Sequence, residues 1–144
     1  MNWSDIGGLA TAIAVLIAAW QVKQNNKLHR ADYEDSFDRQ YRDLAMIIPM
    51  DVFLGKHQEI TTETREAIFN YFDLCNEQIY QHQKGRISND TWKDWSAGIR
   101  SNMNYPVFAS VWTEVCVNAG GTFTYLENFL YGRGFVSKPW SYYL

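Results

Sequence analysis

Acidic side chains at helical spacing are the residues best suited to chemistry in this sequence. Asp73 and Glu77 are four residues apart, as are Asp90 and Asp94, so each pair lies on one face of a helix. Two carboxylates on one face can hold a cation or divide acid and base roles. The same spacing also occurs on solvated helix faces, and both interpretations stay open.

Further polar residues accompany the first acidic pair. If helices predicted over 62–83 and 89–103 form a hairpin, arginines just after the first helix and within the second can reach its carboxylates. We expect these residues to form a buried polar network first, and a set of ligand contacts second. The set is Asp73, Asn76, Glu77, Tyr80, Arg86 and Arg100.

Common catalytic and metal-binding patterns are missing from the sequence. There is no Gly-rich phosphate loop, no Cys-x-x-Cys and no His-Glu-x-x-His. No arginine is followed by a histidine at the four-to-six-residue spacing of small helical RNases. The histidines His29, His57 and His82 lie in different segments, and Cys75 and Cys116 lie on or beside apolar stripes. We therefore expect no catalytic residue, no cofactor and no metal site.

Composition narrows the class of protein. The 144 residues carry a formal net charge of −3, which provides no basic face for binding duplex DNA. Hydrophobic residues make up 47% of the chain, so we expect a folded protein, and 144 residues are enough for one domain, or a small domain with an appendage. Aromatic residues reach 16%, which favours a packed core or adhesive interfaces.

An uncharged stretch near the N-terminus predicts a membrane helix. Residues 6–22 contain no charged side chain, and a helix from Trp3 to Val22 is about 30 Å long, the thickness of a bilayer's hydrocarbon core. Trp3 and Trp20 then lie near its two ends, where indole rings favour the headgroup level. The sequence thus predicts a single transmembrane helix with the lipid bilayer as a partner.

The charges around this stretch predict its orientation. Lys23, Lys27 and Arg30 follow it, whereas only Asp5 precedes it. This asymmetry places the N-terminus outside and the rest of the chain in the cytoplasm of a bacterium, as a single-pass protein of the inner membrane. The alternative is a buried or interfacial helix of a soluble oligomer. A cleaved signal peptide is disfavoured because the chain has no basic start.

Small residues in the same stretch predict helix–helix association. Small-xxx-small spacings let helices approach closely, and here we expect them to support a homo-oligomer. Alanine is also simply a good helix former, so the pattern has two explanations. The small residues are Gly7, Gly8, Ala10, Ala14 and Ala18.

The remaining sequence predicts helices only. A continuous helix from about residue 5 to 48 is favoured by one apolar face, with Pro49 as its stop and residues 24–26 as the place of a bend, if the helix bends. Residues 49–61 are predicted to be a loop, with further helices over 62–83, about 89–103, from 106, and about 122–131. The fold class is thus all-α: a transmembrane anchor with a basic juxtamembrane segment at 1–30, continuing into a compact cytosolic bundle of four to five helices at 31–144.

The C-terminal tail is unusually aromatic. It ends Pro-Trp-Ser-Tyr-Tyr-Leu, and we expect Trp140, Tyr142 and Tyr143 to dock on the domain or on a protein partner.

Five segments carry a resemblance to other proteins: residues 37–44, 71–80, 84–88, 92–102 and 106–112. In them the chain resembles a widespread group of short uncharacterised bacterial proteins with one N-terminal membrane helix and a helical cytosolic domain. The layout is also similar to small membrane proteins of bacterial antiviral systems, such as the accessory proteins of type VI-B CRISPR loci. The resemblance implies a fold and a cellular place but no reaction.

Three functions follow from these features. The first is a non-enzymatic, membrane-anchored oligomer, in one version a bacterial defence effector acting at the inner membrane. The second is a membrane-tethered binding module or minor subunit of a larger membrane complex. The third is a degenerate nuclease or hydrolase that uses Asp73, Glu77 and a neighbouring arginine.

Overall fold

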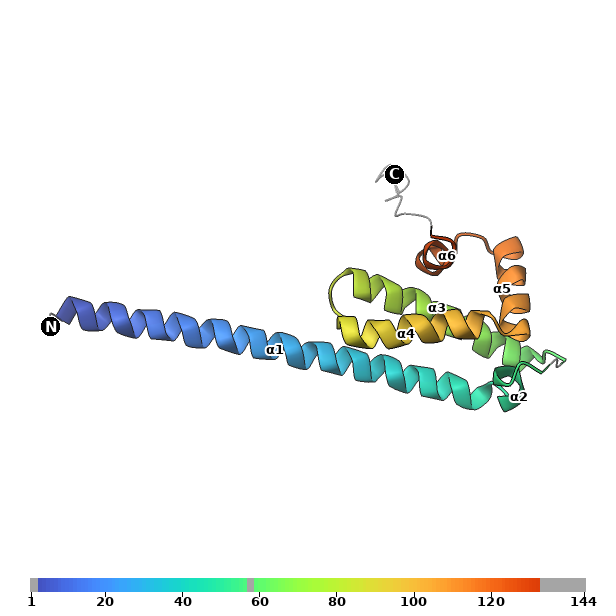
Figure 1. Ribbon diagram of the computed structural model, residues 1–144, viewed down its shortest axis with the longest axis horizontal. Helices are drawn as coiled ribbons and strands as arrows, with labels where there is room; N and C mark the ends of the chain where they lie inside the picture. The colour runs from blue at the N-terminus through green and yellow to red at the C-terminus, as the bar shows by residue number, and fades with distance from the viewer. Residues whose placement is uncertain (1–2, 57–58, 133–144) are drawn as a thin grey trace.

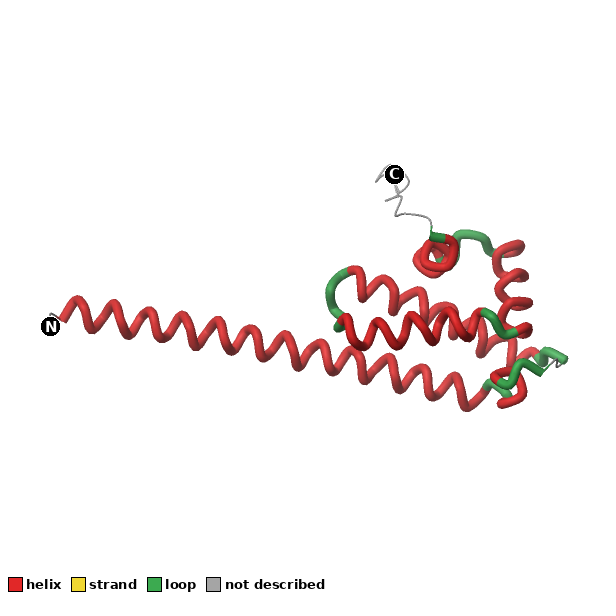
Figure 2. The backbone as a smooth tube through the Cα atoms, viewed as in Figure 1, coloured by secondary structure: helices red, strands yellow, loops and turns green. Residues whose placement is uncertain are grey.

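Six α-helices make up the structure, a computed structural model that describes residues 3–56 and 59–132, with side chains from Thr11 onward. No strand occurs in this part of the chain, which confirms the all-α prediction (Figure 2). The C-terminal residues Trp140, Tyr142 and Tyr143 lie outside the described residues. The helices are α1 (Trp3–Ile47), α2 (Met50–Phe53), α3 (Thr62–Gln83), α4 (Asn89–Met103), α5 (Pro106–Asn118) and α6 (Thr124–Tyr131).

Helix α1 is a long rod whose N-terminal half projects away from all the other helices (Figure 1). It runs without interruption through residues 24–26, the place where the sequence would put a bend if the helix had one. It ends at Ile47 because Pro49 disfavours helical geometry in the preceding residue. The segment after Pro49, predicted to be a loop, contains the short helix α2.

The membrane-spanning helix predicted near the N-terminus is not supported. Among the described residues, no helix is long and apolar enough to cross a membrane. The expected localisation, a single-pass inner-membrane protein with the N-terminus outside and the domain in the cytoplasm, is therefore wrong. The physical reason is charge: Lys23, Lys27 and Arg30 follow the apolar residues, so no stretch of the described helix stays apolar over the length that a hydrocarbon core of about 30 Å requires.

Local sequence explains where the helices of the domain begin. The Thr61 hydroxyl accepts a hydrogen bond from the backbone N–H of Thr64 at 3.1 Å, and this caps α3. Ser88 caps α4 in the same way, accepting from the N–H of Thr91 at 3.2 Å. Between these helices Gly85 has a φ of +71°, a left-handed conformation that glycine adopts without strain. The hairpin of α3 and α4 is therefore built from a cap at the start of each helix and one glycine in the turn.

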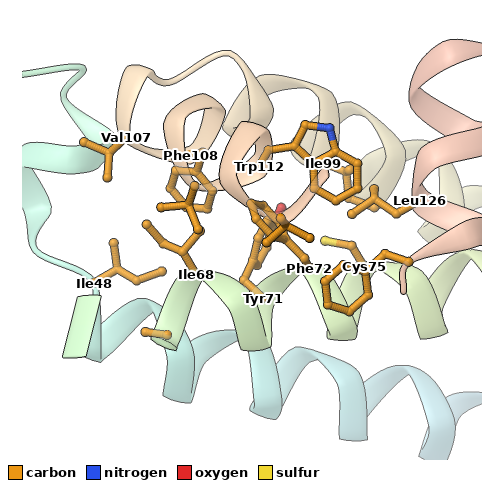
Figure 3. Close-up of a cluster of buried hydrophobic side chains, with 14 of the residues drawn as sticks. Ile48, Ile68, Tyr71, Phe72, Cys75, Ile99, Val107, Phe108, Trp112 and Leu126 are labelled. Atoms are coloured by element: carbon orange, nitrogen blue, oxygen red, sulfur yellow. The ribbon is translucent and has the colours of Figure 1, made fainter. Parts of the chain in front are cut away.

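Helix α3 is the centre of the core and contacts α1, α5 and α6. Ile68, Phe72 and Cys75 of α3 are fully buried, and Figure 3 shows them facing Phe108 and Trp112 of α5. The Phe72 ring meets the Trp112 ring edge-on, with centroids 5.1 Å apart. Aromatic residues of α3 and α5 thus fill much of the interior of one helical domain.

The C-terminal half of α1 belongs to this domain. Phe37 is buried with Leu74 and Ile87, and its ring meets Trp95 of α4 with centroids 5.7 Å apart. Ile48, just after the helix, lies in the main core. We call residues 30–132 the helical domain, because Arg30 Nη2 donates a hydrogen bond to the Gly85 carbonyl at 3.0 Å and so ties α1 to the α3–α4 turn.

Candidate functional site

The free half of α1 is the first candidate site. We call residues 13–29 the stalk; every side chain in it is exposed. Its large apolar side chains are between 49% and 70% exposed, well above the exposure expected of packed residues. They are Ile13, Val15, Leu16, Ile17, Trp20, Val22 and Leu28.

The small residues predicted to promote association fall in and before the stalk. Ala14 and Ala18 are exposed on it. Gly7, Gly8 and Ala10 lie within α1, in the part whose side chains are not described, and so does Trp3.

The structure distributes the predicted polar set over three local arrangements. The first joins Glu77 to Arg86 through Gln81: the Gln81 amide donates to Glu77 Oε1, and Arg86 Nη1 donates to Gln81 Oε1 at 2.9 Å. Asp73 and Glu77 also line a groove of about 360 Å³ between α1 and α3, together with Asp43. Two of the predicted carboxylates therefore lie on the surface of α3, and Arg86, just after the helix, is linked to one of them through Gln81.

The second and third arrangements hold α6 in place. Asn76 Oδ1 accepts hydrogen bonds from the backbone N–H groups of Tyr125 and Leu126, at 2.9 and 3.1 Å, and the Tyr80 ring packs on Tyr125. Arg100 lies over the Phe129 ring at 4.1 Å from its centroid. These three residues of the predicted set position the last helix.

A pocket where α1, α3 and α4 meet is the second candidate site, and we call it the three-helix pocket. Its cavity volume is about 230 Å³. Buried residues from α3 and α4 form its floor, and half-buried and exposed residues from α1 and α4 form its rim. The lining residues are Asp38, Tyr41, Tyr71, Gln78, Asp94, Trp95, Gly98, Ile99 and Asn102.

Hydrogen bonds fix part of this lining. Trp95 Nε1 donates to Asp38 Oδ1 at 3.1 Å, and Asn102 Nδ2 donates to the Tyr71 hydroxyl at 2.9 Å. Burial raises the pKa of Tyr71 far above its ordinary value, so its hydroxyl keeps its proton at neutral pH. The two pairs hold an indole and a phenol of the lining in place.

The cysteines take no part in either site. Burial raises the pKa of the Cys75 thiol to about 12, and a hydrogen bond with Tyr71 offsets this only in part. The thiol is therefore protonated at neutral pH and packs as a small apolar side chain. In the part of the chain that the structure describes, no three or more His, Cys, Asp or Glu side chains are placed to hold a metal ion.

Comparison with other proteins adds no assignment: no family model, no curated protein and no solved structure matches the chain.

Most residues of the three-helix pocket were not predicted as site residues. Asp94 was singled out only as one of an acidic pair, and Gln78 and Asn102 were not singled out at all. A signal for them exists, because Gln78 is one helical turn from Leu74 and Asn102 one turn from Ile99, so each is a polar residue within a buried stripe.

Proposed function

We propose that this chain is a non-enzymatic protein that self-assembles through its stalk and thereby clusters its helical domains. The observation that carries the proposal is the exposure of large apolar side chains along the whole stalk. Such side chains are typical of a helix that is buried by other helices. The occupant that we propose for the stalk's surface is the stalk of further copies of the same chain.

The arrangement of these side chains favours more than two copies. Ile13, Leu16, Ile17 and Trp20 follow the three-and-four spacing that places them on one side of the helix. Val15 and Val22 are seven residues apart and lie on another side. A single neighbouring helix covers one of these sides, so both are buried only when each stalk has at least two neighbours.

Surface area leads to the same number of copies. The stalk is about 25 Å long and about 10 Å wide, so its wall measures about 800 Å² all round. A specific interface usually buries about 800 Å² on each partner. One neighbour reaches less than half of the stalk's wall, whereas a bundle of three or more stalks buries most of it.

The energies are of the required size. Each of the six side chains on the two sides is already half covered by its own helix, so burying the rest contributes about 1 kcal/mol apiece. Association costs about 4–15 kcal/mol in lost translational and rotational freedom. A pair that buries one side on both stalks gains about 8 kcal/mol, which lies within this range of costs, and a bundle that buries both sides gains more for each chain.

Light scattering after size exclusion in aqueous buffer tests the proposal. We expect a defined assembly of three or more chains for the unmodified protein. The double change Leu16→Glu with Ile17→Glu should return it to a monomer with unchanged domain stability. Val117→Glu is the matched control, since Val117 is 77% exposed on α5 of the domain, and it should leave the assembly intact. A monomeric unmodified protein would contradict the proposal.

A second function, a binding module, is favoured by the three-helix pocket, whose lining holds polar and charged groups that a ligand could engage. The defence role inferred from the layout and the hydrolase based on Asp73 and Glu77 stay predictions.

A further inference from the structure

The Gln78 side chain faces the three-helix pocket. Gln78 is only 5% exposed and lines the cavity. Across the described residues, 3–56 and 59–132, its amide forms no hydrogen bond with another group of the protein. No fully buried polar side-chain atom lacks a partner in this part of the chain, so the Gln78 amide is open to solvent through the cavity. A ligand in the pocket would replace that solvent and accept or donate a hydrogen bond there.

The charged residues of the pocket determine whether its ligand is a cation or an anion. Asp38 and Asp94 line it, and no Lys, Arg or His is among its lining residues. Neither carboxylate forms an ion pair in the described part of the chain, where the ion pairs join Lys56 to Asp51 and Arg65 to Glu114. Two uncompensated carboxylates attract a cation and repel an anion.

The aromatic rings of the pocket favour an organic cation. Tyr41, Tyr71 and Trp95 all line the cavity, and aromatic faces attract ammonium and guanidinium groups. The Trp95 indole is held by its bond to Asp38 and by its edge contact with Phe37, so its position is set before a ligand arrives. Such preorganised walls reduce the entropy that binding costs.

Gly98 on the rim has no structural reason to be glycine. It lies in the interior of α4 without a positive φ, and a Cβ placed on it would meet nothing within 4 Å. Glycine weakens a helix relative to alanine, so this position loses helix stability without gaining a turn or a close approach. What it does provide is an open rim one turn along the helix from Asp94.

From these four observations we propose that the three-helix pocket binds a small organic cation with N–H donors, an alkylammonium or guanidinium group. The carboxylates of Asp38 and Asp94 and the amide oxygen of Gln78 accept its hydrogen bonds, and the aromatic walls contact its alkyl and charged parts. The cavity of about 230 Å³ is smaller than the roughly 300–1,000 Å³ of drug-sized sites. The ligand is therefore a small amine or the charged end of a longer one. The proposal does not depend on assembly through the stalk.

Calorimetric titration of the full chain with agmatine, which carries both cationic groups, tests the proposal. We expect saturable binding that Asp94→Asn weakens about tenfold, as loss of a charge-assisted hydrogen bond does. Asp90→Asn is the matched control, because it removes the same charge one turn away and outside the pocket lining. Gly98→Leu should close the rim and abolish binding, whereas Ala97→Leu, on the adjacent exposed position, should not.

A second measurement separates a binding role for Gln78 from a structural one. Gln78→Met keeps the volume of the side chain and removes the unpaired amide, so the unfolding temperature without ligand should not fall. Agmatine affinity should nevertheless drop severalfold. Titrations with n-butylammonium, n-butylguanidinium and 1-butanol then identify the preferred group. The proposal is overturned if agmatine does not bind saturably, if Asp90→Asn weakens binding as much as Asp94→Asn, or if 1-butanol binds as tightly as n-butylammonium.

Discussion

The two halves of α1 have the same secondary structure and opposite surroundings. In the domain half, Phe37 is 6% exposed and packs against α3 and α4. In the stalk, Leu16 is 70% exposed, and no described part of the chain covers it. Apolar side chains of similar size are therefore buried at one end of a single helix and exposed at the other (Figure 1).

The difference between the halves lies in the pattern of their apolar residues. In the domain half, Phe37, Leu44 and Ile48 repeat at helical spacing on one side, which suits a helix with one packed face. In the stalk, apolar residues such as Leu16 and Val22 lie on more than one side. A helix with one apolar face needs the neighbours that its own domain provides, and a helix with several needs neighbours from elsewhere.

The largest expected effect contrasts the core with the stalk. Phe72→Ala should lower the free energy of unfolding by about 4 kcal/mol, because a fully buried ring is lost and a cavity remains. Leu16→Ala should change the domain's stability by less than about 0.5 kcal/mol, as exposed substitutions do. Urea denaturation of both variants, made in the monomeric background, measures the contrast. A large loss with Leu16→Ala would mean that the stalk packs on the domain.

A slightly smaller loss of stability is expected when the two halves of α1 are compared with each other. Phe37→Ala should cost about 3 kcal/mol, because the ring fills the space between Leu74, Ile87 and Trp95. Trp20→Ala removes a still larger side chain from the stalk and should leave the domain's unfolding free energy almost unchanged. Hydrogen exchange of α4 amides provides a second readout, since only Phe37→Ala should increase their exchange.

Glu34 gives the attachment of α1 a pH dependence. Burial raises the pKa of Glu34, but hydrogen bonds from the Ser88 backbone N–H and the Thr91 hydroxyl, both 2.7 Å long, and the nearby Arg30 outweigh it and hold the pKa below its ordinary value of 4.5. Its stabilising effect is full above the unfolded pKa and is lost as the pH falls through the lower folded pKa. Glu34→Gln should therefore cost about 1 kcal/mol at pH 7 and nothing at low pH. Urea denaturation at a series of pH values measures this, and an equal loss at every pH would contradict it.

The smallest effect is a gain. Gly98→Ala should raise the free energy of unfolding by up to about 1 kcal/mol, since the added methyl group has space and favours the helix. Ala97→Gly, at the neighbouring exposed position, should lower it by a similar amount. Thermal unfolding of the two variants checks both signs, and a loss with Gly98→Ala would show that the glycine is required by the fold.

Sequence patterns predicted the helices of the domain well because their boundaries are local. Thr61 and Ser88 cap helices through bonds to residues three positions later, and Pro106 begins α5 at a position that needs no backbone donor. The helix α2 was missed because its four residues span little more than one helical turn, which is too short to show a repeating pattern of apolar residues. Glu34, which joins α1 to the start of α4, was missed because its partners are 54 and 57 residues away.

The candidate pocket could not be predicted for a related reason. Asp38, Gln78 and Asp94 come from three helices and meet only through the packing of the domain. No spacing within the sequence relates them. The stalk's apolar character was evident from composition, but the same composition describes a helix in lipid and a helix among copies of itself. Its membrane interpretation is not supported, because no helix among the described residues is long and apolar enough to cross a membrane.

Because α1 is a single uninterrupted helix, its residues in the wall of the three-helix pocket and its residues in the stalk move together. Asp38 and Tyr41 line the cavity, and Ile13 lies about 38 Å away along the same rod. A tilt of only about 5° at Asp38 therefore sweeps Ile13 sideways by roughly 3 Å over a helix of this length. The helix acts as a lever arm, so that an event at the cavity becomes a displacement at the far tip.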